Sequence, residues 1–380
     1  MDASLGNPGL TRLAAADRTA IDPRPRWAGV DAARGLAVLG MIAAHTVPRS
    51  GGLGATELVV DGRPSLLFAL VAGVSLGLMT GQDAPSPAGE RSERQLRLLI
   101  RALALVLAGV LLWLLPHGIA VILDYYGVMF LLMVPLLFLP RLALAAVGAA
   151  VLVIGPALRD AVERAGVPEQ EPAATAVEYL LTGWYPALLW VPVLAAGLLA
   201  ARSGLGRRRV RLALVLGGAS ASIVGYGAAM LLPQITGGAS LGIEEITAEA
   251  HSGTIAELLG SGGLAAAALG LLLVLLDPAT PESQAAAAPR TARLVLEPLR
   301  ALGRVALTVY VGHVLVVAAL APLGGAGRFE GAVGWGILIV LSVAGVAVGL
   351  ACEALGRRGP LEAALSGLSV LPFRPARVRD

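Results

Sequence analysis

Long apolar runs alternate with short polar segments along most of the chain, a pattern typical of a protein that crosses a membrane many times. Each run is close to the roughly 20 residues that a helix needs to span a bilayer. The predicted fold class is therefore all-α, a polytopic integral membrane bundle of about ten transmembrane helices. These helices are predicted over residues 27–47, 63–80, 96–115, 119–139, 142–158, 176–201, 212–232, 254–276, 299–320 and 332–351.

The composition is typical of a membrane protein and excludes several other classes of protein. Of the 380 residues, 56% are apolar and 14% are charged, and the mean hydropathy is +0.77. Cys352 is the single cysteine, which excludes an intrachain disulfide framework, and we predict no metal site. The pI near 9.4 is explained by arginines spread over several loops rather than by one basic patch, so no nucleic-acid partner is predicted.

The arginines predict which loops face the cytoplasm, because positively charged loops are retained on that side. The first 26 residues carry four arginines, and residues 202–211 form the most basic loop. Residues 233–253 hold acidic residues and no arginine, which favours the outer face. Both termini are therefore predicted to be cytoplasmic. The predicted parts are a tail of residues 1–26, a transmembrane domain of residues 27–352 and a tail of residues 353–380.

The first predicted helix carries three ionisable side chains, Asp31 and Arg34 near its start and His45 near its end. Such a group inside a bilayer costs about 3 kcal/mol or more unless it is paired or hydrated. Ten residues separate Arg34 from His45, so they lie about 16 Å apart along one helix and on nearly the same face. The pattern indicates a functional site that reaches from the cytoplasmic edge into the bundle.

His45 and Arg34 each allow two interpretations. The imidazole of His45 could take a proton from an acceptor hydroxyl or amine, or itself receive an acyl group. Alternatively it only forms a hydrogen bond with a backbone carbonyl at the helix end. Arg34, oriented by Asp31, could bind an anionic ligand, such as one with phosphate groups, through forked hydrogen bonds. Alternatively these two residues form an ion pair that serves membrane topology alone.

Three further polar residues have two interpretations each. Asp124, next to two tyrosines, could line a sugar site or relay protons, or could be a hydrogen-bonded packing residue. His313 lies well inside the ninth predicted helix, where it could belong to a site or form a structural hydrogen bond between helices. His251, in a predicted outer loop, could contact an acceptor, although an exposed loop histidine usually has no role.

The sequence V-D-A-A-R-G-L-A-V-L-G-M-I-A-A-H at residues 30–45 resembles the first core helix of the heparan-α-glucosaminide N-acetyltransferase family and its bacterial relatives. Its arrangement of Arg, ten residues and His is similar to the signature of the acyltransferase-3 family. Both resemblances imply acyl transfer within or across a membrane. The segment D-G-R-P-S-L-L-F-A-L-V-A-G-V-S is similar to the start of the family's next helix, which implies that Asp61 holds the imidazolium of His45 and that Arg63 binds substrate.

The chain departs from the family at one point. In one branch of the family an Asn stands at the position of His45 and the catalytic His follows in the next loop. Residues 46–60 contain no His, so either His45 takes that role or the chemistry differs. Segments such as L-T-G-W-Y-P-A-L-L-W-V-P and L-G-R-V-A-L-T-V-Y extend the resemblance over most of residues 27–365.

The sequence thus predicts an integral-membrane acyltransferase of a bacterial cell membrane. It would move an acyl group, in the first place acetyl from acetyl-CoA, from cytoplasmic acyl-CoA to a hydroxyl or amino group of a cell-envelope glycan or lipid-linked sugar. The oligomeric state stays open, and a homo-oligomer is one alternative. The predicted catalytic residues are His45 and Asp61, and the predicted donor-binding or substrate-binding residues are Asp31, Arg34, Arg63, Asp124 and His313.

Two other functions stay open, a proton-coupled transporter or exporter and a non-catalytic membrane partner protein. An acyltransferase predicts that Arg34, His45 and Asp61 converge on one pocket. A transporter predicts a water path that links Asp124 and His313 to both faces of the membrane.

Overall fold

The computed structural model describes residues 26–47, 60–166, 171–235, 247–277, 290–324, 329 and 331–370. Within these residues the chain forms helices joined by turns and loops, with no β-strand, which confirms the predicted all-α class. The predicted N-terminal tail, apart from Arg26, and much of the predicted acidic loop lie outside the described residues.

The helices follow the apolar runs of the sequence closely. Their bounds are α2 (Ala28–Thr46), α4 (Arg63–Met79), α5 (Ala88–Trp113), α6 (Leu123–Met133) with the 3-10 turn η1 (Val134–Leu136), α7 (Arg141–Ala165), α8 (Ala173–Val177) with the π-helical turn η2 (Glu178–Thr182), α9 (Ala187–Ser203), α10 (Arg208–Ile235), α11 (Ile255–Leu276), α12 (Arg290–Arg304), α13 (Ala306–Gly324), α14 (Gly331–Ala354) and α15 (Pro360–Val370).

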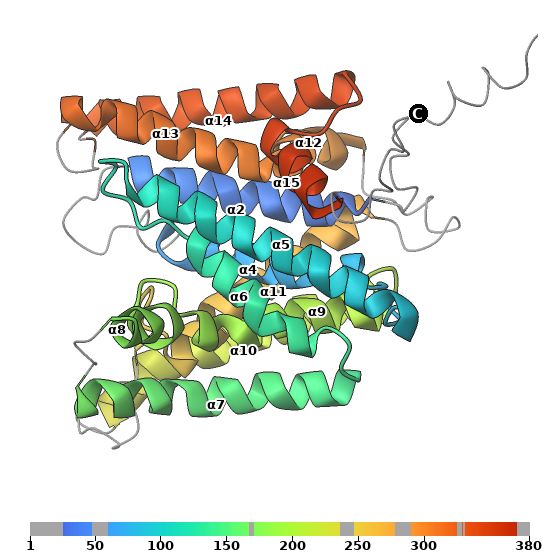
Figure 1. Cartoon of the computed structure of the whole chain (residues 1–380), viewed down its shortest axis with the longest axis vertical. Coiled ribbons are helices and arrows are strands. Elements are labelled where there is room, and N and C mark those ends of the chain that lie inside the picture. The colour runs from blue at the N-terminus through green and yellow to red at the C-terminus, as the bar shows by residue number, and fades with distance from the viewer. Residues whose placement is uncertain are drawn as a thin grey trace, which may run out of the picture.

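Most of these helices lie side by side in one bundle (Figure 1). Helices α13 and α14 form one side of the bundle and α7 the opposite side, with α2, α4 and α5 between them (Figure 1). Helix α2 is capped by Asp277 at the end of α11, whose carboxylate accepts hydrogen bonds from the N–H groups of Ala28 (2.9 Å) and Gly29 (2.7 Å). The cap satisfies backbone donors that a helix start leaves unpaired, and it ties α2 to α11.

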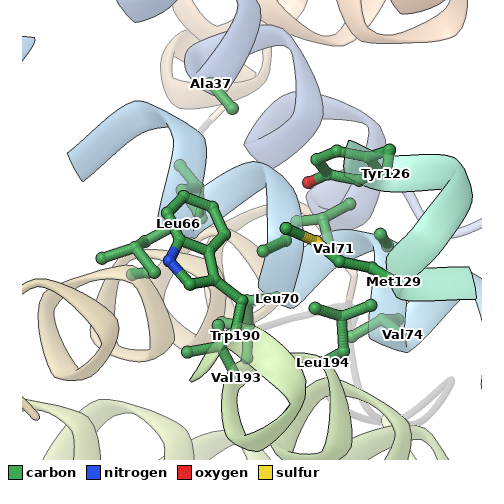
Figure 2. Packing of buried hydrophobic residues seen from close by; sticks show 14 of the residues in the cluster. Ala37, Leu66, Leu70, Val71, Val74, Tyr126, Met129, Trp190, Val193 and Leu194 are labelled. Atoms are coloured by element: carbon green, nitrogen blue, oxygen red, sulfur yellow. The ribbon is translucent and has the colours of Figure 1, made fainter. Parts of the chain in front are cut away.

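The core of the bundle is apolar and closely packed around α4 and α9. Trp190 is fully buried and lies near Leu66 and Leu70 of α4 (Figure 2). The two helices approach closely at Gly73 and Gly197, where a methyl group on either glycine would overlap backbone atoms of the other helix. Small residues at such contacts are typical of helices that pack in a membrane.

Five helices of the described chain are long and apolar enough to cross a membrane, or up to seven if each of two bent pairs is one span. The bent pairs are Ala173–Thr182 with Ala187–Ser203, at 44°, and Thr291–Arg304 with Ala306–Pro322, at 77°. Helices α4 and α6 are apolar but shorter, and α2 carries charge. The protein is a membrane protein, whereas ten spans and cytoplasmic termini stay predictions.

Two predicted helices are in fact broken. The predicted helix over residues 176–201 breaks between Thr182 and Ala187, before Pro186, because a residue that precedes proline is disfavoured in helical geometry. The predicted helix over residues 299–320 breaks at Val305. There Glu362 accepts hydrogen bonds from the N–H groups of Leu307 (2.7 Å) and Thr308 (3.1 Å), so α15 caps the first turn of α13. Residues 360–370 are thus a docked helix within the segment predicted as a tail.

Candidate functional site

A cavity of about 630 Å³ lies at the end of the bundle where α2 ends. We call it the histidine cavity, because three of the four histidines of the chain line it. The last turn of α2, the turn before α4, the turn after α5 and the loops before α9 and α11 form its walls. Its polar and aromatic lining residues are His45, Asp61, Ser65, Trp113, His117, Trp184, Tyr185 and His251.

The fourth histidine contacts the first. Nδ1 of His45 lies 2.9 Å from Nε2 of His313, and the two rings are nearly parallel, with an interplanar angle of 8°. His313 is 1% exposed and lies in α13, where Tyr310 packs edge-on against its ring. One of the two facing nitrogens must carry the hydrogen and the other must accept it. The contact therefore couples the tautomer of His45 to that of a buried partner.

The other two histidines have their tautomers set by backbone groups. Nδ1 of His117 accepts a hydrogen bond from the N–H of Ile119 (2.9 Å), so Nε2 carries the hydrogen and donates to the carbonyl of Leu112 (2.8 Å). Both nitrogens of this ring stabilise the turn after α5. Nδ1 of His251 lies 3.1 Å from the carbonyl of Trp184, so Nδ1 carries the hydrogen there.

A second cavity, of about 1140 Å³, lies at the opposite end of α2. We call it the arginine cavity, because seven arginines from the start of α2, from α5 and from the turn before α15 line it. Three of them pair with carboxylates, Arg34 with Asp31 (2.8 Å), Arg94 with Glu90 (2.7 Å) and Arg97 with Glu93. The seven arginines are Arg26, Arg34, Arg94, Arg97, Arg101, Arg357 and Arg358.

The remaining four arginines give this cavity an excess of positive charge among the described residues. The pKa of the Arg26 guanidinium is lowered, and burial is the main cause. Asp31 opposes this shift, whereas the nearby positive charges, Arg304 foremost, add to it. Crowded, partly buried guanidinium groups of this kind are typical of sites that bind phosphate groups.

Arg34 joins three helices at the edge of the arginine cavity. Its guanidinium donates hydrogen bonds to Asp31 in α2, to Oγ of Ser75 in α4 (3.0 Å) and to the carbonyl of Gly303 in α12 (3.3 Å). The ion pair with Asp31 matches both interpretations of the sequence, since it can orient Arg34 toward a ligand or serve packing.

The expectation that Arg34, His45 and Asp61 converge on one pocket is wrong. His45 and Asp61 line the histidine cavity, and Arg34 lines the arginine cavity. The reason is the length of α2, since eleven positions along a straight helix separate the two side chains by about 16 Å. One helix thus connects two cavities.

Two other predicted site residues lie away from both cavities. Arg63 donates a hydrogen bond from Nε to the hydroxyl of Tyr226 (2.8 Å) and lies over its ring, so the described contacts of its side chain are with α10. Asp124 is fully buried, and its Oδ2 accepts hydrogen bonds from Trp113 (2.9 Å) and Tyr179 (2.6 Å). Because Trp113 also lines the histidine cavity, Asp124 contacts its wall from behind.

Two of the buried charges that sequence reasoning missed hold turns or loops beside the cavities. Glu257, which is 0% exposed, holds the loop that carries His251. Arg202, which is 1% exposed, donates hydrogen bonds to the carbonyls of Gln82 (2.8 Å) and Leu137 (2.9 Å), among others, and so fixes the turn after α4 beside the arginine cavity. The signal for both was a charged residue at the end of an apolar run. Within the described residues no group of three or more His, Cys, Asp or Glu side chains could hold a metal ion.

Two known families match this chain, one over its first part and one over its second part. Residues 26–224, just over half of the chain, match the family described as "Heparan-alpha-glucosaminide N-acetyltransferase, catalytic". The protein is thus a membrane protein of the acetyltransferase class. The chain belongs to the heparan-alpha-glucosaminide N-acetyltransferase catalytic family, as its first helix predicted.

The rest of the chain has a different match. Residues 223–370 match a family described as a protein of unknown function (DUF418), and no curated protein matches the chain. His251 and His313 lie in this second part, whereas His45 and Asp61 lie in the first. Both parts of the chain therefore contribute residues to the lining of the histidine cavity, and the second part also supplies His313, which contacts His45. The similarity to the acyltransferase-3 signature stays a prediction.

Proposed function

We propose that the protein transfers an acetyl group from acetyl-CoA, bound at the arginine cavity, to an amino or hydroxyl group of a sugar in the histidine cavity. The observation that carries the proposal is the hydrogen bond between His45 and His313 at the end of the helix whose other end holds Arg34. Membership in an N-acetyltransferase family supports the same reaction.

The arginine cavity suits the donor. Coenzyme A carries a diphosphate and a third phosphate, and guanidinium groups bind such oxygens through paired hydrogen bonds. Arg101, Arg357 and Arg358 line this cavity and have no carboxylate ion pair among the described residues. The thioester at the end of the flexible arm of coenzyme A would extend along α2 toward His45.

The histidine cavity suits an acceptor sugar. Trp113 and Trp184 offer aromatic faces for the apolar face of a sugar ring, and Asp61 offers a carboxylate for its hydroxyl groups. If Nδ1–H of His45 donates to Nε2 of His313, then Nε2 of His45 is the basic nitrogen. It takes the proton of the acceptor as that N or O attacks the thioester carbonyl. The C–S bond then breaks, and the thiolate of coenzyme A receives the proton from His45.

The same geometry suggests which side each substrate occupies. The most basic loops lie at the end of the bundle with the arginine cavity, so donor binding from the cytoplasm and acceptor binding from the outer face follow from the positive-inside rule. The acceptor would then be a glycan or a lipid-linked sugar of the cell envelope. A transporter would need Asp124 and His313 on a water path, yet neither lines either cavity.

An assay of the purified full-length protein in detergent or nanodiscs tests the proposal. With acetyl-CoA labelled in the acetyl group and glucosamine as acceptor, we expect release of the free thiol and transfer of the label to glucosamine. Thiol release without label on glucosamine would indicate a different acceptor or an acetyl group held on the protein. No thiol release with glucosamine or with crude cell-envelope glycan would contradict the proposal.

A further inference from the structure

The loop before α11 brings one of the three histidines of the histidine cavity, His251, into place with a constrained backbone. His251 has a φ of +64°, and Gln82 is the only other non-glycine residue with positive φ among the described residues. For a residue with a Cβ this conformation costs on the order of 1 kcal/mol and persists where the surroundings enforce it. The ring of His251 packs edge-on against Trp184 and Tyr185, which also line the cavity.

Glu257 enforces this conformation from inside the bundle. Its Oε1 accepts a hydrogen bond from the N–H of His251 (2.7 Å), and its Oε2 accepts from the N–H of Gly253 (2.7 Å) and from Oγ of Ser252 (3.3 Å). Arg159 of α7 also donates to the carbonyl of Ser252. A buried carboxylate with this many donors is a rigid anchor.

The ring orientation then decides which nitrogen of His251 can act. Since a carbonyl can only accept, the contact with Trp184 requires the hydrogen on Nδ1 of His251. In the neutral ring Nε2 is therefore the acceptor nitrogen. It can accept a hydrogen bond from an amino or hydroxyl group that enters the histidine cavity.

We infer that His251 binds the acceptor through Nε2 and that Glu257 is the positioning residue that holds His251 in place. The inference rests on the proposed function. It assigns a part in acceptor binding to the half of the chain that matches a family of unknown function. His45 takes the proton in this arrangement, and His251 orients the group that loses it.

Isotope-labelled histidine (nitrogen-15) makes the inference directly testable, because the chain has four histidines. Spectra of the full-length protein would be recorded at a pH of about 8, above the ordinary histidine pKa of about 6.5, and assigned with single variants. We expect His251 with its hydrogen on Nδ1 and His117 with its hydrogen on Nε2. Addition of glucosamine should shift the Nε2 resonance of His251. The tautomer of His117 should not change, because backbone groups occupy both of its ring nitrogens, and it serves as the internal control.

Kinetics separates acceptor binding from a purely structural role. His251→Gly, which suits the positive φ, should raise the KM for glucosamine about tenfold and leave the KM for acetyl-CoA unchanged. Glu257→Gln should raise the same KM, and the double variant should be no worse than His251→Gly, because Glu257 acts through His251. Glu249→Gln, a charge change in the same loop, is the matched control and should behave as wild type.

The outcomes are distinguishable from failure of the proposed function. Three outcomes would overturn the inference while acetyl transfer continues. These are a hydrogen on Nε2 of His251, an unmoved His251 resonance when glucosamine shifts that of His45, and an unchanged KM for glucosamine in His251→Gly. Absence of acetyl transfer by the wild-type protein together with no shift at any histidine would overturn both.

Discussion

Nδ1 of His45 lies 2.9 Å from Nε2 of His313, a contact between residues 268 positions apart. The two histidines come from α2 and α13, and the two helices belong to the two parts of the chain that match different families. One of these two nitrogens carries the hydrogen and the other accepts it, so the tautomers of His45 and the buried His313 are coupled. His313 is thus a positioning residue for the proposed base, although the sequence placed it among the substrate-binding residues.

Replacement of His313 should therefore lower turnover more than substrate binding. His313→Leu removes the acceptor for Nδ1–H of His45, and we expect kcat for acetyl transfer to fall about 10²-fold at an unchanged KM for acetyl-CoA. His313→Gln keeps a side-chain acceptor and should retain more activity. Wild-type kcat in His313→Leu, measured by transfer of labelled acetyl groups, would show that the contact only packs helices.

Arg34→Lys should weaken donor binding. An ammonium group cannot reproduce the hydrogen bonds that the planar guanidinium makes to Asp31, Ser75 and Gly303, nor a forked contact with phosphate. We expect the KM for acetyl-CoA to rise about tenfold, with the KM for glucosamine unchanged. Arg141→Lys, at the exposed start of α7, is the matched control for replacement of a guanidinium by an ammonium group. An effect of Arg34→Lys no larger than that of Arg141→Lys would mean that only the positive charge of Arg34 matters.

The contact between α2 and α12 depends on a glycine. A methyl group on Gly303 would overlap the backbone oxygen of Asp31, so Gly303→Ala should push the two helices apart. We expect a loss of about 1–3 kcal/mol in the free energy of unfolding, seen as a lower Tm in detergent. Gly312, in α13, has no described atom within 4 Å of a Cβ and gives the matched control Gly312→Ala. A Tm for Gly303→Ala as high as that of the control would contradict the packing.

Much of the fold could be predicted because apolar runs mark membrane helices. The predicted helix over residues 96–115 in fact begins at Ala88, and that over residues 142–158 continues to Ala165. Both differences have one cause, since charged turns extend a helix beyond its apolar part. Helix α15 was missed because its eleven residues are too few to span a bilayer, so the segment was assigned to a tail.

The relative positions of the site residues could be predicted from the sequence only within one helix, α2. The separation of Arg34 and His45 follows from helix geometry and needs no tertiary information. The pairing of His45 with His313 depends on which helices are neighbours, and the loop that carries His251 depends on the buried Glu257. Arg63 was assigned to the site because its segment resembles the start of the family's next helix, yet its side chain donates a hydrogen bond to Tyr226 of α10 instead.

Membrane topology follows from the arginines and can be tested separately. A reporter fused after Asp380 or inserted near Arg208 should be cytoplasmic, because basic segments are retained on that side. A reporter inserted near Glu245 should be external. An external signal from either of the first two positions would reverse the assignment of donor and acceptor faces.

The most direct test of the account replaces His45 by Asn. Asn has a side chain that can still form hydrogen bonds, but it cannot act as a base near neutral pH. The full-length protein, wild type and His45→Asn, would be incubated with labelled acetyl-CoA and glucosamine, and a Tm would verify folding of both. If His45 takes the proton of the acceptor, turnover should fall about 10²-fold or more in the folded variant. Wild-type turnover in His45→Asn would contradict this prediction and would show that another group takes the proton.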